Sequence, residues 1–335
     1  MTGKTPYLSI VVISRNDDHG GNLLQRMQLF IDSLYKQCNH YHLETELIII
    51  EWNPPVNRER LFDILIWPKD RQHLTIRIIT VPQDLHERFN HSDKIPLFQM
   101  IGKNVGIRRA HGQFILATNI DILFSDELMN FISKRQLKYG VVYRTNRIDL
   151  ESAFLSKILR TNTKYYILNF QNLESLVKEI FASPSLIGYY LKNAMYKFKI
   201  PRMHYNACGD FTLMAKEHWL TLRGYPELEI FSLHIDSLLL MATFYSGLKE
   251  QILQSPKEIY HLEHAIGSGI TPGAGQILLH KRLKDNQIPF LTWRDVINIG
   301  QTYKKNRRKG KTHITGNNDS WGLGDIQLLE KVIGD

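Results

Sequence analysis

Apolar residues of this chain gather in short runs separated by segments with helical spacing. Four runs rich in aliphatic and β-branched residues predict buried strands, at positions 8–14, 46–51, 75–81 and 113–117. Segments 22–37 and 96–110 instead place apolar residues three and four positions apart, which predicts helices with one buried face. Strands that alternate with helices predict an α/β fold with a doubly wound, mostly parallel sheet flanked by helices.

The second half of the chain has a different pattern. Residues 151–200 are rich in leucine and aromatic residues at helical spacing, which predicts an inserted helical segment that packs on the sheet or covers a site. A further core segment is expected at 210–222 and a helix at 235–246. We therefore divide the chain into four parts: 1–150, 151–200, 201–300 and a basic C-terminal extension, 301–335.

Charge and composition narrow the classes of partner. The 335 residues carry a formal charge of +9, and the densest basic run lies at 304–311. This charge suits an anionic partner. The basic run could contact an anionic membrane surface peripherally. The same run lacks the interleaved aromatic residues that are typical of a nucleic-acid binder. No apolar run approaches the roughly 18 residues of a membrane span. With only Cys38 and Cys208, far apart in sequence, the expected setting is the reducing cytoplasm.

The expected ligand site is one edge of the sheet. Doubly wound sheets bind ligands beyond the carboxyl ends of their strands, here the loops after Ile13, Ile50 and Ala117. Asp121 lies in the last of these loops, two residues after Asn119. A carboxylate there could bind a hard divalent cation together with diphosphate oxygens. An aspartate that simply forms a turn or caps a helix remains the alternative.

A longer motif surrounds Asp121. The run from Asn104 to Asp121 resembles the stretch of family-2 glycosyltransferases that reads Asn-x-Gly-apolar-x-x-Ala-x-Gly, then a strand, then Asn-Pro-Asp or Asp-x-Asp. The first strand followed by Arg15-Asn16, and the second strand ending in Glu51, are similar to the opening of that family. Two positions depart from its pattern, because Glu51 stands where aspartate is usual and Asn119 replaces the first aspartate of Asp-x-Asp.

The resemblance implies a GT-A fold and an inverting transfer from a nucleoside-diphosphate sugar, UDP-linked by default, to a hydroxyl of a glycan or glycolipid. Residues 1–150 would then bind the donor and 201–300 the acceptor, with Mn²⁺ or Mg²⁺ as cofactor. The residues expected at the donor are Ser14, Arg15, Asn16, Glu51, Asn104, Arg108, Asn119 and Asp121.

The acceptor half contributes the remaining candidates that the resemblance implies. Asp236 opens the predicted helix at 235–246 and would be the general base, while Gly209 and Asp210 would line the sugar pocket. His261 is expected to complete the metal site, with His264 as the second candidate. As isolated patterns, Asp236 could be an ordinary first-turn acid, and the histidine pair could be a surface feature without metal.

Trp321 lies in a polar island, 317–323, and suits stacking on a sugar ring; a structural loop anchored by a buried indole is the alternative. Two other functions stay in view for the whole chain. A catalytically inactive glycan-binding or scaffold protein could keep this fold. A sugar nucleotidyltransferase is more remote, because no glycine-rich opening loop with a following Lys or Arg is present.

Overall fold

The computed structural model describes residues 5–69, 72–150, 198–264 and 272–334. The described strands form a mixed eight-stranded sheet in the order β11-β3-β2-β1-β4-β8-β6-β9, in which β3, β2, β1 and β4 run parallel. Its strands are β1 (Leu8–Ser14), β2 (Thr45–Trp52), β3 (Leu74–Val81), β4 (Phe114–Ala117), β6 (Val141–Thr145), β8 (Thr212–Ala215), β9 (Lys249–Leu253) and β11 (Leu329–Val332). The predicted α/β class, with a mostly parallel central sheet flanked by helices, is confirmed.

A second, three-stranded sheet brings distant parts of the sequence together. It contains β5 (Ile122–Phe124), β10 (Ile259–Leu262) and β7 (Arg147–Leu150), with β10 in the middle. His261 of β10 pairs with Ile122 of β5 on one side and with Asp149 of β7 on the other. This register sets a histidine from late in the chain beside the loop that carries Asp121.

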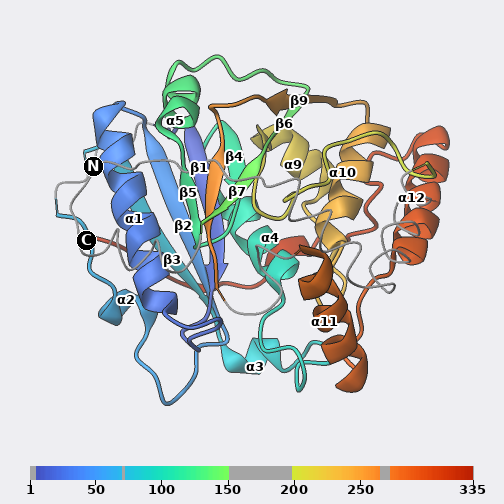
Figure 1. The fold of residues 1–335 in the computed structure, drawn as a ribbon, viewed down its shortest axis with the longest axis horizontal. Helices are drawn as coiled ribbons and strands as arrows, with labels where there is room; N and C mark the ends of the chain where they lie inside the picture. Colours follow the sequence, from blue (N-terminus) through green and yellow to red (C-terminus); the bar gives the residue numbers. More distant parts are fainter. Residues whose placement is uncertain (1–4, 70–71, 151–197, 265–271, 335) are drawn as a thin grey trace.

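Helices cover both faces of the large sheet, and alternate side chains of β1 serve the two layers (Figure 1). Leu8, Ile10 and Val12 are buried in one cluster with the apolar face of α1 (Leu23–His40) and with α5 (Asp126–Ser133). Val11 and Ile13 belong to the other cluster. That second layer contains α4 (Gln99–Arg109), α9 (Lys216–Leu222), α10 (Ile235–Tyr245) and α12 (Trp293–Arg308). Because both faces are covered, the central strands read as nearly continuous apolar runs.

Helix α4 packs very closely on the sheet. A Cβ atom at Gly102 would overlap the side chain of Ile13, and one at Gly106 would overlap that of Val11. Gly106 is the glycine of the Asn-x-Gly motif, so this part of the motif has a packing role: it lets α4 approach β1 and β2. The close approach also sets the start of α4 near the ends of these strands.

The C-terminal part belongs to the same fold. Helix α12 extends across position 300, and β11 adds an antiparallel edge strand to β3. The remaining described helices are α2 (Leu61–Ile64), α3 (Gln83–His86), α11 (Pro272–Asp285) and a short 3-10 helix, η1 (Trp321–Leu323). The inserted segment predicted at 151–200 lies outside the described residues, apart from its last three positions. None of the described helices combines the length and apolar character needed to span a membrane.

Candidate metal and donor site

Asp121, His261 and His264 lie together beyond the end of β4. One ligand atom from each lies within 4.8 Å of the other two, so this triad could hold a metal ion. Nε2 of His264 is 3.0 Å from Oδ2 of Asp121, and Nε2 of His261 is 3.9 Å from the same oxygen. Both histidines named from the sequence therefore reach the predicted carboxylate.

The carboxylate of Asp121 is only 6% exposed and has two different oxygens. Oδ2 accepts a hydrogen bond from Nη1 of Arg26 at 2.9 Å, whereas Oδ1 is buried without a partner among the described residues. Burial would raise the pKa of Asp121, but the hydrogen bond with His264 and the charges of both histidines and Arg26 outweigh it and lower the pKa to about 2. The carboxylate is thus ionised at neutral pH, and its Oδ1 has no hydrogen-bond donor among the described residues.

His261 is oriented by a second carboxylate. Its Nδ1 lies 2.9 Å from Oδ1 of Asp149, which leaves Nε2 on the side of Asp121. Burial alone would lower the pKa of His261, but the hydrogen bond with Asp149 and the negative charge of Asp121 raise it above its ordinary value. A carboxylate on the far nitrogen of an imidazole is the arrangement that fixes the ring of a metal-binding histidine.

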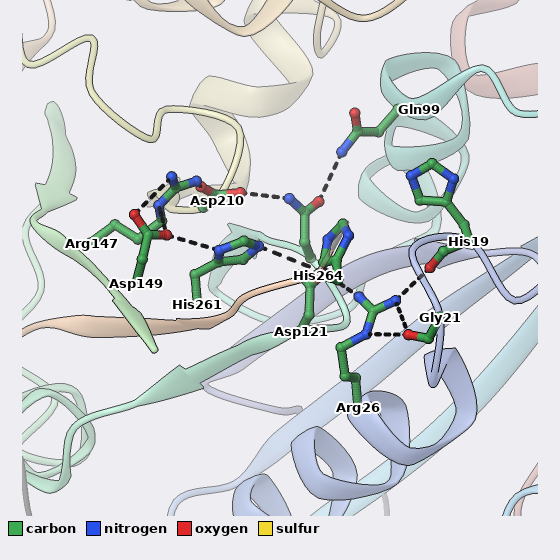
Figure 2. A network of polar contacts seen from close by, with 11 residues as sticks. His19, Gly21, Arg26, Gln99, Asp121, Arg147, Asp149, Asp210, His261 and His264 are labelled. Atoms are coloured by element: carbon green, nitrogen blue, oxygen red, sulfur yellow. Dashed lines mark hydrogen bonds and ion pairs between the residues drawn. The ribbon is translucent and has the colours of Figure 1, made fainter. Parts of the chain in front are cut away.

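The polar network continues to the predicted sugar pocket (Figure 2). Arg147 on β7 contacts Asp149 at 3.1 Å and donates to Oδ2 of Asp210 at 2.7 Å. Oδ1 of Asp210 accepts from the amide of Asn119 at 2.6 Å, and Asn119 in turn accepts from Gln99 at 2.9 Å. Asn119 therefore binds Asp210 rather than Asp121, and it links the loop after β4 to the turn before β8.

A loop between β1 and α1 closes over the triad. Nη2 of Arg26 donates to the carbonyl oxygens of His19 and Gly21 at 2.5 and 3.2 Å, while Nη1 holds Asp121. Gly20 has a φ of +76°, and a Cβ atom at this position would overlap the ring of His264. The loop thus needs glycine for both its backbone conformation and its contact with the triad.

The same edge of the sheet contains a pocket of about 460 Å³. It lies beyond β1, β2 and β3, and its lining residues are Arg15, Asn53, Pro54, Pro55, Val56, Asn57, Gln83, His86, Glu87, Ser92 and Asp93. Arg15 is held there by a hydrogen bond from Nε to the carbonyl oxygen of Asn53 at 2.7 Å. Of the residues expected at the donor, Arg15 is the one that lines this pocket.

Three other donor candidates near this edge are buried and have partners inside the fold. Ser14 contacts the sulfur of Met27, and the amide of Asn16 donates to the carbonyl oxygen of Glu59. Glu51 is 1% exposed. Its Oε2 accepts from Nε of Arg60 at 2.8 Å and its Oε1 accepts from the backbone of Leu61 at 2.7 Å, so this carboxylate fixes the chain at the start of α2.

Asn104, Arg108 and Trp321 have partners inside the fold, away from the triad. Arg108 donates to the carbonyl oxygens of Asp319 and Trp321 at 2.7 and 2.9 Å, and its guanidinium lies 5.2 Å from the centre of the indole. Asn104 exchanges hydrogen bonds with the backbone of Tyr225. Trp321 is only 5% exposed, so its indole offers no free face to a sugar and packs as an anchored structural loop. Asn104 and Arg108, which were expected at the donor, thus make these hydrogen bonds inside the fold, and their donor contacts stay a prediction.

Asp236 lies in the first turn of α10 and is half-buried. Its Oδ1 accepts a hydrogen bond from the backbone of Ser237 at 2.8 Å. Gly209 lies against it, because a Cβ atom built on Gly209 would be 3.0 Å from Oδ2 of Asp236. Gly209, Asp210 and Asp236, all three expected on the acceptor side, are therefore neighbours in the fold.

Sequence reasoning missed Arg26, Arg147 and Asp149. Arg26 lies within the apolar stripe of its helix, and a charged residue at such a position signals a buried partner. Arg147 and Asp149 are two apart, which on a strand places both side chains on one face. Neither signal names the partner, because the partners lie 95 and 63 or more positions away.

Comparisons with known proteins give structural likeness only. No protein-family model and no curated protein sequence matches this chain. Among solved structures, S. aureus TarS 1-349 has a TM-score of 0.44 at 12% identity, and the match covers 90% of this chain and 72% of that one. The same fragment in complex with UDP-GlcNAc has a TM-score of 0.45 at 12% identity and the same coverage. The structure titled S. aureus TarS has a TM-score of 0.43 at 12% identity, covering 92% of this chain and 44% of that one.

Proposed function

We propose that this protein is an inverting glycosyltransferase that transfers a sugar from a nucleoside-diphosphate sugar to a hydroxyl of a glycan or glycolipid. The observation that carries the proposal is the buried triad at the carboxyl edge of parallel strands, where α/β sheets bind their ligands. The pocket lined by Arg15 lies on the same edge and has room for a nucleoside. A UDP-linked donor follows from the resemblance of the 104–121 motif to family-2 enzymes.

The triad fits a divalent metal ion. Oδ1 of Asp121 is buried without a partner among the described residues, and His261 is oriented by Asp149 with Nε2 toward the triad. Two imidazoles and one carboxylate suit Mn²⁺ better than Mg²⁺, because Mg²⁺ prefers oxygen ligands. When bound, the ion would neutralise the negative charge of the leaving diphosphate. Arg26 stays on Oδ2 and keeps the carboxylate oriented.

The chain's own residues divide the remaining work. Asp236 removes the proton of the acceptor hydroxyl as that oxygen attacks the sugar, an effect worth about 10²- to 10⁴-fold in rate. Asp210 orients the acceptor side through its fixed bonds to Asn119 and Arg147. Glu51 fixes the start of α2 through its bond to the backbone of Leu61.

A donor-hydrolysis assay tests this proposal. The protein is incubated with UDP-GlcNAc, UDP-glucose or UDP-galactose, with Mn²⁺ or with EDTA, and released UDP is measured. We expect release from at least one donor that needs Mn²⁺ and rises when a glycan acceptor is added. Donor binding without any release, in the presence of acceptors, would instead support an inactive glycan-binding protein.

A further inference from the structure

A buried lysine lies between the donor and acceptor sides of the site. Lys103 is on α4, and its side chain is 0% exposed. Its Nζ donates to the carbonyl oxygen of Gly209 at 2.7 Å, which is its single hydrogen bond in the described part of the chain. An ammonium group has three protons to donate. The position of Lys103 therefore needs an explanation other than hydrogen-bond satisfaction.

Negative charge supplies part of that explanation. Burying a lone ammonium costs several kcal/mol unless opposite charges compensate it. Lys103 is attracted by Asp210, Asp236 and Asp121, which come from three separate segments, and the thiol of Cys208 is the remaining titratable neighbour. Burial lowers the pKa of Lys103 to about 8 against the attraction of these acids, so the group is mostly charged at neutral pH.

The hydrogen bond to Gly209 acts on a tight turn. The backbone N–H groups of Asp210 and Phe211 both donate to the carbonyl oxygen of Ala207, and Ala207 has a φ of +49°. The turn holds Gly209 against the carboxylate of Asp236 and presents Asp210 to Asn119 and Arg147. A displacement of the Gly209 carbonyl would therefore move Asp210 and change the close contact between the turn and the proposed base, Asp236.

We propose that Lys103 is a positioning residue, which ties helix α4 to the turn 207–210 and thereby sets where Asp236 and Asp210 stand relative to Asp121. We call this link between α4 and the turn the tie. Its effect on turnover rests on the proposed glycosyl transfer, whereas the tie itself rests on the hydrogen bond from Lys103 to Gly209. Lys103 acts through the Gly209 carbonyl and needs no contact with the reacting atoms. Through its charge, Lys103 also attracts the carboxylates of Asp210, Asp236 and Asp121, which come from both halves of the proposed site.

Hydrogen exchange tests the tie without any assumption about activity. We compare wild type with Lys103→Met and with Lys134→Met, a control at an exposed lysine beyond α5. The amides of Asp210 and Phe211 should exchange at least about tenfold faster in Lys103→Met and at the wild-type rate in Lys134→Met. In wild type, protection of the same amides, corrected for intrinsic rates, should fall between pH 7 and 9. The pH series decides the matter if Lys103→Met does not fold, and unchanged protection in either experiment overturns the proposal.

Kinetics then test the consequence for transfer. Lys103→Met should lower kcat about 100-fold, the size that a shift of about 1 Å can produce, while KM for the donor changes less than threefold. Wild-type kcat should decline above about pH 8, and Lys103→Met should lack this decline. Equal kcat and equal pH profiles overturn the inference. If exchange responds as expected but wild type uses no nucleotide sugar, the proposed function fails and the tie stands.

Discussion

Two polar clusters flank helix α4, and they differ in how completely their hydrogen bonds are satisfied. At the C-terminal end of the helix, Arg108 and Arg109 donate to five carbonyl oxygens of residues 319–326. On the other side, around Asp121, a buried carboxylate oxygen has no partner among the described residues, and Lys103 has a single hydrogen bond there. The first cluster satisfies its donors, whereas the second leaves a buried carboxylate oxygen without a partner among the described residues.

The two ends of the 104–121 motif thus differ: Arg108 and Arg109 contribute to stability, whereas Asp121 contributes to the proposed function. Buried polar groups without partners are rare in folded proteins, because each costs roughly 1 to 3 kcal/mol. Such groups are tolerated where a ligand completes them. We therefore expect variants in the anchor formed by Arg108, Arg109 and 319–326 to alter stability, and variants in the triad to alter activity.

The largest effect is expected at Asp121. Asp121→Ala removes the carboxylate from the triad and leaves Arg26 buried without its partner, so sugar transfer should fall at least about 1,000-fold. Initial rates of UDP release measure this. Asp319→Ala changes an exposed carboxylate of the anchor and serves as the matched control. Full activity of Asp121→Ala would remove the triad from the donor site.

A comparable or smaller effect on turnover is expected at Asp236. Asp236→Asn keeps the shape of the side chain but removes the base, so kcat should fall about 10²- to 10⁴-fold while the donor still binds. Stopped assays for kcat and titration calorimetry for donor affinity separate the two effects. Turnover equal to wild type would leave Asp236 as a helix-capping acid.

The anchor should respond in the opposite way. Arg109→Gln loses most of the bonds to the carbonyl oxygens of Gly322, Leu323 and Ile326, so the free energy of unfolding should fall by about 2 kcal/mol. The kcat per folded molecule should change less than about twofold. Urea unfolding and initial rates measure the two quantities, and a large loss of kcat with unchanged stability would reverse our assignment of this cluster.

Acid titration gives the smallest effect. The pKa of the Asp121 carboxyl is about 2 in the folded protein, against 3.8 for an unperturbed aspartate. The ionised group therefore stabilises the fold above about pH 4. This stabilisation, roughly 2 kcal/mol, should disappear as the pH falls from 4 to 2. We therefore expect the free energy of unfolding, measured with urea in EDTA, to fall by about 2 kcal/mol more in wild type than in Asp121→Asn as the pH falls from 4 to 2. Parallel pH dependences would contradict the buried ion pair with Arg26.

Much of the fold could be predicted from the sequence because hydrophobic periodicity reports local structure. The predicted strand at 8–14 coincides with β1, and the predicted helix at 235–246 differs from α10 by one residue. The edge strand β11 was not predicted, because LEKV at 329–332 is half charged and its pairing with β3 depends on contacts such as Arg77 with Glu330.

The candidate site was predictable only in part. Asp121, His261 and His264 were recognised individually, since acids at strand ends and paired histidines are visible in one dimension. Their partners Arg26 and Asp149, and Lys103 nearby, were not, because a buried charge reveals its partner only when the chain is folded. Within the 104–121 motif, the side chain of Asn104 binds the backbone of Tyr225 and that of Arg108 binds the C-terminal segment, contacts that the motif alone does not reveal.

Titration of Mn²⁺ into the metal-free protein tests the central claim most directly. Calorimetry on wild type, Asp121→Ala and Arg109→Gln, each with UDP present, counts the metal sites of each protein. The account predicts one site in wild type and Arg109→Gln and none in Asp121→Ala. One site of equal affinity in all three proteins would contradict the assignment of the metal to Asp121, His261 and His264.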